Sequence, residues 1–316
     1  MMINHDIIAS EQSRAEQSSI ILLFISEDMT YVNKALSVLV KQYDKIMLKY
    51  VSSASSNNIN ITNSNGINLQ YIHPQDLKKV NYDYLLICGG KDYGVSNIVK
   101  MFSKFDIDPE KVFYDWIVCI PGFTKKKYDK LCKSQLSIVS MNCFGGIISH
   151  TLGLPFRSPF VNMFFSEEDF LKVLKNFDSY MHKEIKFVRM DYEQNLKREY
   201  PVFAFGDGIT LNMNHYTDRL DAENKWYERI KRLNYYNTLV VMYTDDINIL
   251  KEFDKLPFSK KCCFVPFETD IECAFTVDVE KDFNKKDMQM WEVANYYAHY
   301  PFKYDVFDLL NYAILR

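Results

Sequence analysis

The strongest constraint on the fold is a series of short, continuously apolar segments that alternate with helical segments. The runs at 20–25, 84–88 and 239–243 carry apolar side chains at every position, which is typical of strands buried on both faces. Capping residues at 26–28 precede an expected helix at 31–43. This alternation predicts an α/β fold, and we expect two tandem Rossmann-like domains with mostly parallel sheets.

The sequence suggests three parts. Residues 1–19 are polar and are interpreted as a flexible leader. An N-terminal Rossmann-like α/β domain is expected at 20–135, ending after the lysine-rich segment 125–133, which reads as a solvated helix face. A C-terminal α/β domain is expected at 136–316. The length of 316 residues and the hydrophobic content of 47% allow two cores.

Composition excludes several classes of function. Lys and Arg number 38 against 41 Asp and Glu, so no excess of positive charge predicts nucleic-acid binding. The seven cysteines show neither a C-x-x-C pair nor a Cys/His ligand spacing, which predicts no metal site and no disulfide framework. The apolar run at 20–25 is too short for a membrane span. We therefore expect a cytoplasmic protein with no membrane span.

Two further motifs each admit a functional and a structural interpretation. The glycine loop at 89–94 lies where a dinucleotide fold holds a pyrophosphate, but it does not match G-x-G-x-x-G, so a connecting turn is favoured. Asp245 and Asp246 follow a buried strand and could hold a divalent metal. The D-x-D spacing is absent there, so a helix N-cap is favoured. The cofactor is therefore left unknown.

The segment 136–160 is the one around which the predicted site is organised. It is interpreted as a buried strand, a tight polar turn, a short helix and a proline-stiffened loop. A strand that feeds a helix N-terminus gathers unpaired amides and the positive end of the helix dipole, which favours anionic groups. We expect an anion or sugar cradle formed by Asn142, Cys143, Gly145, Gly146, Arg157 and Ser158.

Cys143 and His150 are the sharpest catalytic hypothesis. The dipole at a helix N-terminus lowers the pKa of a thiol, and a histidine seven residues later returns to the same helix face, so it could act as the base. The two residues would be about 10.5 Å apart along the helix axis. A buried structural cysteine is therefore the favoured alternative.

A second group of candidates lies later in the chain. His215 is a further catalytic candidate, and together with Arg229 it would approach the cradle to bind an anion. Each of these residues is by itself more typical of a cap or an ion pair. Trp226 could stack on a sugar, although a core or interface anchor is favoured.

Three motifs together resemble a bacterial family known as domain of unknown function 1919, whose members are often labelled exopolysaccharide biosynthesis proteins. The first joins Ser140–Gly146 with Leu152–Leu154 and Ser158–Phe160. The second and third comprise Tyr200–Val202, His215-Tyr216, Lys225-Trp226, Arg229, Arg232 and Asn234, and then Phe253–Phe258 and Lys260–Phe264. The resemblance implies a tandem α/β architecture and a surface-polysaccharide theme, and it supplies no catalytic residue.

We therefore expect a protein of cell-surface or exopolysaccharide biosynthesis. The leading hypothesis is a glycan-related transferase that binds a nucleotide-activated or anionic sugar. The alternative is a non-catalytic sugar-binding or protein-interaction module, with a protein partner in a polysaccharide assembly system. The sequence leaves open whether the protein is an enzyme.

Overall fold

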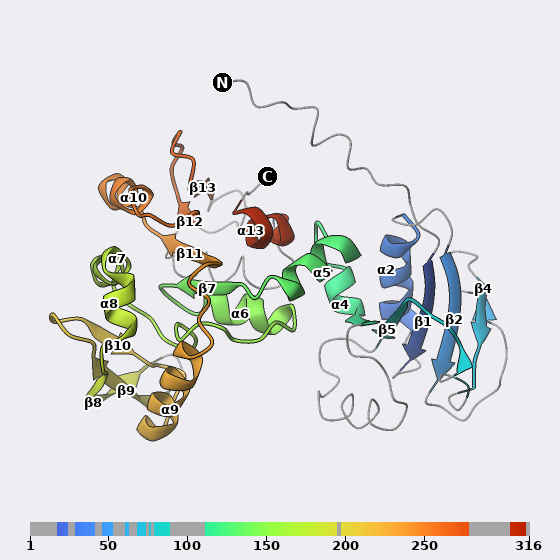
Figure 1. Ribbon diagram of the computed structural model, residues 1–316, viewed down its shortest axis with the longest axis horizontal. Coiled ribbons are helices and arrows are strands. Elements are labelled where there is room, and N and C mark those ends of the chain that lie inside the picture. Colours follow the sequence, from blue (N-terminus) through green and yellow to red (C-terminus); the bar gives the residue numbers. More distant parts are fainter. Residues whose placement is uncertain are drawn as a thin grey trace. The chain divides into compact units, whose positions relative to one another are not determined.

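The computed structural model describes residues 18–24, 29–41, 46–52, 61–62, 68–73, 76, 79–88, 111–194, 197–277 and 304–313. The chain divides into two compact units between Ile120 and Pro121 (Figure 1). This division precedes the boundary expected at residue 135, and the lysine-rich segment belongs to the second unit. The glycine loop at 89–94 and residues 1–17 of the leader lie outside the described residues.

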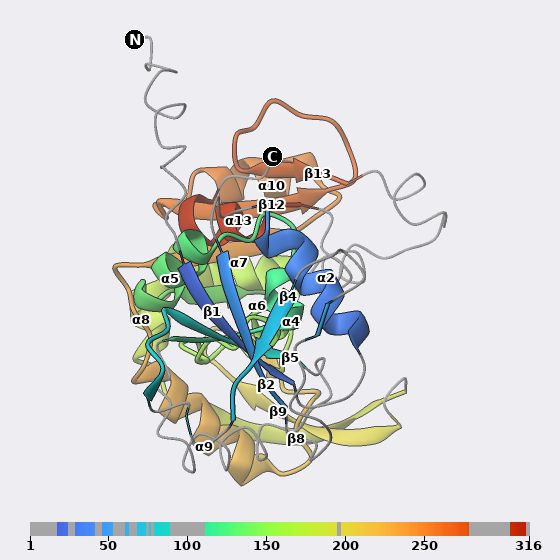
Figure 2. The same cartoon turned by 90° about the vertical axis from the view of Figure 1, so that its right-hand side faces the viewer.

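The first unit is built on one six-stranded sheet. Its order is β3-β4-β2-β1-β5-β6, and every neighbouring pair except β3 and β4 is parallel. The strands are β1 (Ser18–Phe24), β2 (Ile46–Ser52), β3 (Ile61–Thr62), β4 (Asn68–Tyr71), β5 (Tyr84–Cys88) and β6 (Val112–Tyr114). Figure 2 shows β1, β2 and β4 side by side. The apolar runs predicted as strands are therefore confirmed here.

Helix α2 (Met29–Leu39) and the short helix α4 (Asp115–Val118) belong to this unit. α2 buries Val32, Ala35, Leu36 and Leu39. Their spacing of three and four residues places them on one helix face. The helix is amphipathic for that reason, and it covers apolar surface instead of standing free in solvent.

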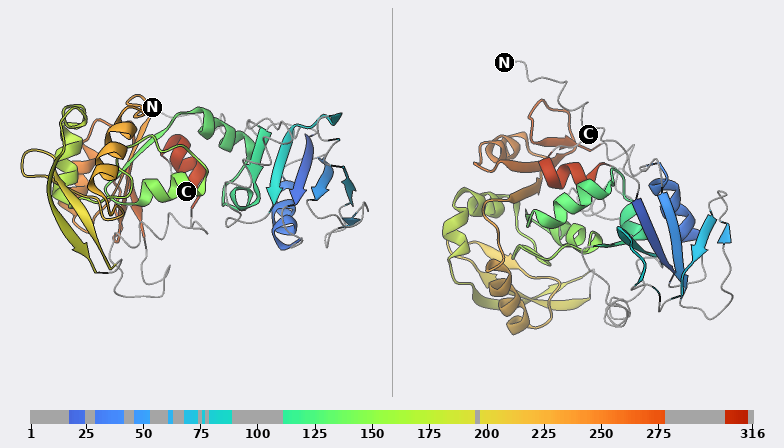
Figure 3. Two further views of the ribbon diagram at one scale, coloured as in Figure 1. Left: turned by 90° about the horizontal axis from the view of Figure 1, so that it is seen from below. Right: turned by 45° about the vertical axis from the view of Figure 1, so that its right-hand side comes forward.

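The second unit contains two sheets, and in Figure 3 the yellow strands of one lie apart from the orange strands of the other, whose remaining strand is green. One is a four-stranded parallel sheet in the order β13-β12-β11-β7. The other is a three-stranded antiparallel sheet in the order β10-β9-β8. The strands are β7 (Ser137–Ser140), β8 (Lys186–Glu193), β9 (Arg198–Ala204), β10 (Thr210–Asn212), β11 (Thr238–Tyr243), β12 (Lys260–Val265) and β13 (Ala274–Thr276). The α/β class with parallel sheets is confirmed.

The helices of the second unit cover these sheets. They are α5 (Lys125–Lys133), α6 (Phe144–Thr151), α7 (Glu167–Lys175), α8 (Phe177–Met181), α9 (Arg219–Ile230), α10 (Ile247–Asp254) and α13 (Val306–Tyr312). Apolar residues recur at helical spacing from Phe170 to Phe177 and predict one helix at 170–181. The structure instead interrupts it at Asn176, whose backbone leaves the helical region at φ −129° and ψ 40°. Among the described residues, no helix is long and apolar enough to cross a membrane.

Aromatic side chains dominate the core of the second unit. Phe160 lies at its centre, with its ring centroid 5.7 Å from Trp226 and 6.2 Å from Phe170. Trp226 also contacts Phe205 edge-to-face at 5.2 Å. Two of these rings come from helices, and the other two come from the loop at Phe160 and from the residue directly after β9. One aromatic cluster therefore joins elements that are far apart in the sequence. The many aromatic residues therefore build a thick core in this unit.

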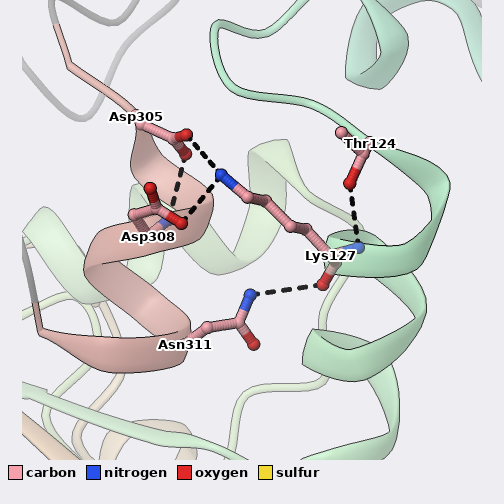
Figure 4. Close-up of polar contacts among 5 residues, drawn as sticks. All are labelled: Thr124, Lys127, Asp305, Asp308 and Asn311. Carbon is pink, nitrogen blue, oxygen red and sulfur yellow. Dashed lines mark hydrogen bonds and ion pairs between the residues drawn. The ribbon is translucent and has the colours of Figure 1, made fainter. Parts of the chain in front are cut away.

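The last described helix is fastened to α5 by a polar clasp, shown in Figure 4. Lys127 Nζ lies 2.7 Å from Asp305 Oδ2 and 2.8 Å from Asp308 Oδ1. Asp305 also accepts the Asp308 amide hydrogen bond that caps α13, and Asn311 Nδ2 donates to Lys127 O. The clasp requires Gly122, because a Cβ there would lie 2.0 Å from Asp305 Cγ.

Two glycines with similar backbone angles allow this close approach to be tested. Gly122 has φ +77°, and Gly208 has φ +78° with open space around it. We expect Gly208→Ala to cost about 1–2 kcal/mol of unfolding free energy, from the left-handed backbone alone. Gly122→Ala is expected to cost roughly 3 kcal/mol or more, because it also displaces Asp305. Urea unfolding of both variants measures the difference; equal losses would contradict the clasp.

Candidate functional site

The parallel pairing of β7 with β11 creates the edge on which the candidate site lies. Ser140 is registered with Val241, so both strands end at the same edge of the sheet. Asn142 and Cys143 follow β7 there, and Tyr243 and Thr244 lie at the end of β11. The carboxyl ends of parallel strands are the usual place for ligands in α/β proteins.

Glu167 joins these residues from the first turn of α7. Thr244 Oγ1 donates to Glu167 Oε2 at 2.6 Å. The Tyr243 side chain hydrogen-bonds with Asn142, and it lies close enough to Glu167 and Cys143 for their charges to affect its pKa. We call Asn142, Cys143, Glu167, Tyr243 and Thr244 the carboxyl-edge cluster. It combines one carboxylate with hydroxyl, thiol and amide groups.

The environment of Glu167 favours its protonated form. Partial burial raises the pKa of the carboxyl group, and the nearby charge of Asp245 adds to this increase, while the hydrogen bond from Thr244 opposes it. Burial also raises the pKa of Tyr243, with smaller contributions from Glu167 and Cys143. A half-buried carboxyl group with a raised pKa is suited to accept and return a proton.

Burial sets the protonation state of Cys143. It raises the pKa of the thiol to about 11, so the group is a protonated thiol at neutral pH and not the thiolate that the catalytic hypothesis requires. His150 is exposed in the last turn of α6. The described contacts show no hydrogen bond between this histidine and Cys143.

The expected amide cradle is already occupied by the protein's own side chains. Phe144 N donates to Asn142 Oδ1, and Gly145 N donates to Ser140 Oγ, both at 3.0 Å. Gly145 serves close packing, since a Cβ there would lie 2.9 Å from Ile138 Cγ2. Gly146 is similarly tight against Val161. Both glycines therefore let α6 pack closely against its neighbours.

Arg157 lies toward the other end of β7. Its carbonyl oxygen accepts a 2.8 Å hydrogen bond from Ser137 Oγ, at the first residue of the strand. Asn142 is five residues further along, or about 16 Å in extended chain. Ser158 Oγ accepts from Phe160 N and shapes the same loop. The structure therefore does not bring the Arg157 backbone to Asn142.

Arg229 forms a second arrangement, which we call the arginine clamp. Its NH1 donates to Tyr216 Oη at 2.5 Å and to Val161 O at 3.4 Å. The guanidinium carbon lies 5.4 Å from the centroid of the Phe156 ring. Arg229 is only 7% exposed, and no carboxylate in the described ranges forms an ion pair with it. The clamp holds α9 against the loop at 156–161.

The remaining predicted residues occupy different places. His215 is exposed, with Nδ1 3.4 Å from Arg198 NH2. Partial desolvation, together with the charge of Arg198, lowers its pKa. Trp226 is 1% exposed in the aromatic core, so it is the core anchor that was favoured. Its Nε1 is buried without a hydrogen-bond partner.

Sequence reasoning missed Glu167 and Tyr243. The polar residues at 166–169 predict a helix start, and Glu167 was interpreted only as part of it. Ser166 does cap α7, because its side chain accepts a hydrogen bond from Asp169 N. Asp246 is the cap of α10, which agrees with the capping interpretation of the Asp245-Asp246 pair. Within the described ranges, no three His, Cys, Asp or Glu side chains are arranged to hold a metal ion. The signal that could have indicated this edge was Thr244, a polar residue directly after the buried strand that ends at Tyr243.

A family model described as domain of unknown function (DUF1919) matches residues 117–313, which is more than half of the chain. The chain belongs to this family. The DUF1919 match takes in the carboxyl-edge cluster, the arginine clamp and the clasp between α5 and α13.

Two individual proteins are also similar. An uncharacterized protein of Haemophilus influenzae is 35% identical over 139 residues, covering 43% of this DUF1919 chain and 64% of the relative. The chain thus spans less than two thirds of that relative. Aspartate semialdehyde dehydrogenase II from Vibrio cholerae matches with 9% identity and a TM-score of 0.23, over 78% of this chain and 67% of the enzyme. That score indicates neither a shared fold nor a shared activity.

The raised pKa of Glu167 predicts how stability depends on pH. Between its ordinary pKa and the raised one, the folded state binds more protons than the unfolded state, so stability falls as pH rises through this window. Glu167→Gln removes this penalty and keeps an acceptor for Thr244. We expect the unfolding free energy of this variant, relative to that of wild type, to be higher at pH 7 than at pH 4. Denaturant unfolding at both pH values measures this difference.

Glu168→Gln is the matched control. Glu168 is exposed in the same turn of α7, so the substitution removes the same charge without removing a buried carboxylate. We expect a small change in stability at pH 7, because the loss of its favourable interaction with the helix dipole is opposed by the relief of its repulsion with Glu167. An equal response of both variants would contradict the environment assigned to Glu167.

The raised pKa of Cys143 predicts slow alkylation. With a pKa of about 11, we expect iodoacetamide to label this thiol roughly a hundredfold or more slowly at pH 7 than an unperturbed cysteine. The rate should rise about tenfold per pH unit towards pH 10. Peptide mapping by mass spectrometry measures it, and rapid labelling at pH 7 would restore the thiolate hypothesis.

Proposed function

We propose that this DUF1919 protein is a transferase of cell-surface or exopolysaccharide assembly. It binds a nucleotide-activated or anionic sugar at the carboxyl-edge cluster. The observation that carries this proposal is the half-buried Glu167, held by Thr244 at 2.6 Å beside Tyr243 and Asn142. A positioned carboxyl group with a raised pKa suits general acid–base catalysis. Hydroxyl and amide groups suit recognition of sugar hydroxyls.

In this mechanism Glu167 is the general base. It accepts the proton of an acceptor hydroxyl, whose oxygen then forms a bond to the anomeric carbon of the donor sugar. The bond between that carbon and a phosphate oxygen breaks, and the nucleotide leaves with the electron pair. Tyr243 donates its O–H to the ligand, since burial keeps it protonated. Roles for Cys143, His150 and His215 in the chemistry stay predictions.

The arginine clamp supports an anionic ligand. A buried guanidinium with only neutral described partners leaves its charge uncompensated. Arginine is well suited to bind phosphate or carboxylate through two parallel hydrogen bonds. We assign Arg229 of α9 to the anionic part of the sugar donor. Arg157 lies on the loop at 156–161 that Arg229 contacts, and its role in binding stays a prediction.

We also infer that the first unit is Rossmann-like and that the protein is cytoplasmic. The parallel order β4-β2-β1-β5-β6 supports the first inference, because β1 lies at the centre and the order reverses between β1 and β5. The second parallel sheet runs in one direction from β7 to β13. Its strand order does not reverse, so it lacks the crevice that such a reversal forms between neighbouring strands in Rossmann folds. Only its parallel pairing supports a Rossmann-like assignment for this sheet.

The second candidate is a non-catalytic sugar-binding or protein-interaction module. It is favoured by the protonated Cys143 and by the α6 amides that are already bonded to Asn142 and Ser140. These features leave the first turn of α6 as a structural element. The two candidates differ in whether the function requires Glu167 to accept and release a proton.

Ligand-induced stabilisation combined with turnover separates the candidates. A panel of nucleoside diphosphate sugars, with neutral and uronic-acid sugars, is screened by thermal shift. A ligand at one hundred times its Kd is expected to stabilise the native state by about 2.7 kcal/mol. We expect Glu167→Gln to keep this stabilisation but to lose roughly 10²–10⁴-fold in transfer of sugar from the bound donor.

Glu168→Gln again serves as the control and should retain both binding and transfer. Stabilisation without measurable donor turnover, unaffected by Glu167→Gln, would support the binding module instead. No stabilisation by any nucleotide sugar or free uronic acid would contradict both sugar-binding proposals.

A further inference from the structure

β8 is a long, exposed strand at the end of its sheet (Figure 1). Within the described part of the chain it pairs only with β9, so its other edge presents backbone N–H and C=O groups to solvent. Four of its side chains are large, apolar and 37–49% exposed: Phe187, Val188, Met190 and Tyr192. Another strand can extend the sheet at such an edge by forming hydrogen bonds with its free backbone groups.

The ladder between β8 and β9 holds this edge in place. Pairing runs from Lys186–Ala204 to Glu193–Arg198, with one bulge at Val188. The proline of β9 does not interrupt it. Pro201 O accepts from Met213 N on the β10 side, and N and O of one strand residue point to the same side. The missing N–H therefore faces away from β8.

The charges of β8 are arranged so that the strand complements itself. Lys186 and Arg189 lie in its first half, whereas Asp191 and Glu193 lie in its second half. In an antiparallel pair of identical strands, the positive half of each faces the negative half of the other. We propose that β8 pairs antiparallel with β8 of a second copy of this chain, so that the two antiparallel sheets become one.

Backbone geometry selects the register of this pairing. At alternate positions of β8, the backbone N–H and C=O groups point away from β9. A hydrogen-bonded pair with a second β8 strand needs such a residue on both strands, so within the regular stretch 189–193 the two-fold axis must lie next to one residue and not between two residues. An axis at Arg189 or Asp191 would bring two like charges together. An axis at Met190 places Arg189 opposite Asp191 of the second copy, twice. This register satisfies both the backbone and the charges.

The Met190 register also separates polar from apolar contacts. Arg189 and Asp191 share one face of β8, where their side chains already lie 3.1 Å apart within one chain. In the dimer they form an alternating network of four charges. Met190 and Tyr192 lie on the opposite face. There Met190 meets Met190 of the second copy, and Tyr192 lies opposite the bulged Val188 and diagonal to Met190. Both faces of the new pair are therefore complementary.

The competing explanation is that these charges protect the edge of a monomer. Sedimentation equilibrium of the full chain, whose mass is 37.3 kDa, distinguishes the two. We expect a reversible dimer whose Kd rises with salt concentration, because exposed ion pairs are screened. Arg189→Glu and Asp191→Arg should each weaken the dimer by roughly tenfold or more, since each places like charges opposite one another.

Mixing the two variants provides a control for correct folding. One carries two negative and the other two positive side chains at these positions, so an equimolar mixture is expected to form a heterodimer. The double variant Arg189→Asp with Asp191→Arg should dimerise like wild type. A monomer at all concentrations, a dimer unaffected by either variant, or no heterodimer would overturn the proposal. None of these outcomes depends on the transferase hypothesis.

Discussion

The parallel hydrogen-bonded pairing of β7 with β11 is the constraint on which the candidate site depends. It joins strands about one hundred residues apart in the chain and aligns Ser140 with Val241. Because the strands are parallel, their carboxyl ends meet at one edge, and Asn142 lies beside Tyr243. Glu167 reaches this edge from α7 through Thr244. Without that pairing, no local segment would assemble these groups.

Burial decides the chemistry of the assembled groups more than their residue type does. Cys143 begins a helix, where the dipole alone would stabilise a thiolate, yet desolvation raises its pKa to about 11. The same effect gives Glu167 an increased affinity for protons. The edge thus presents neutral hydrogen-bonding groups around one half-buried carboxyl group, and this is a suitable environment for a polyhydroxylated ligand.

Much of the local structure was predictable because it depends on neighbouring residues. The apolar runs became strands, Ser166 and Asp246 became helix caps, and Trp226 became part of the core. The prediction was less accurate where distant contacts decide. The helix expected at 170–181 is interrupted at Asn176. β8 was missed although its charged and apolar side chains largely alternate, which is typical of a strand with an exposed face, because the prediction relied on continuously apolar runs.

The sequence by itself determined the α/β class, the order of most elements and the family, because apolar periodicity, capping residues and local motifs are properties of short segments. Only the tertiary structure decided which of the predicted site residues meet. Asn142 and Cys143 join Glu167 and Tyr243, whereas the Arg157 backbone lies toward the opposite end of β7. The physical reason is that strand pairing and burial depend on residues far apart in the chain, and these two effects set both the positions and the proton affinities of the site.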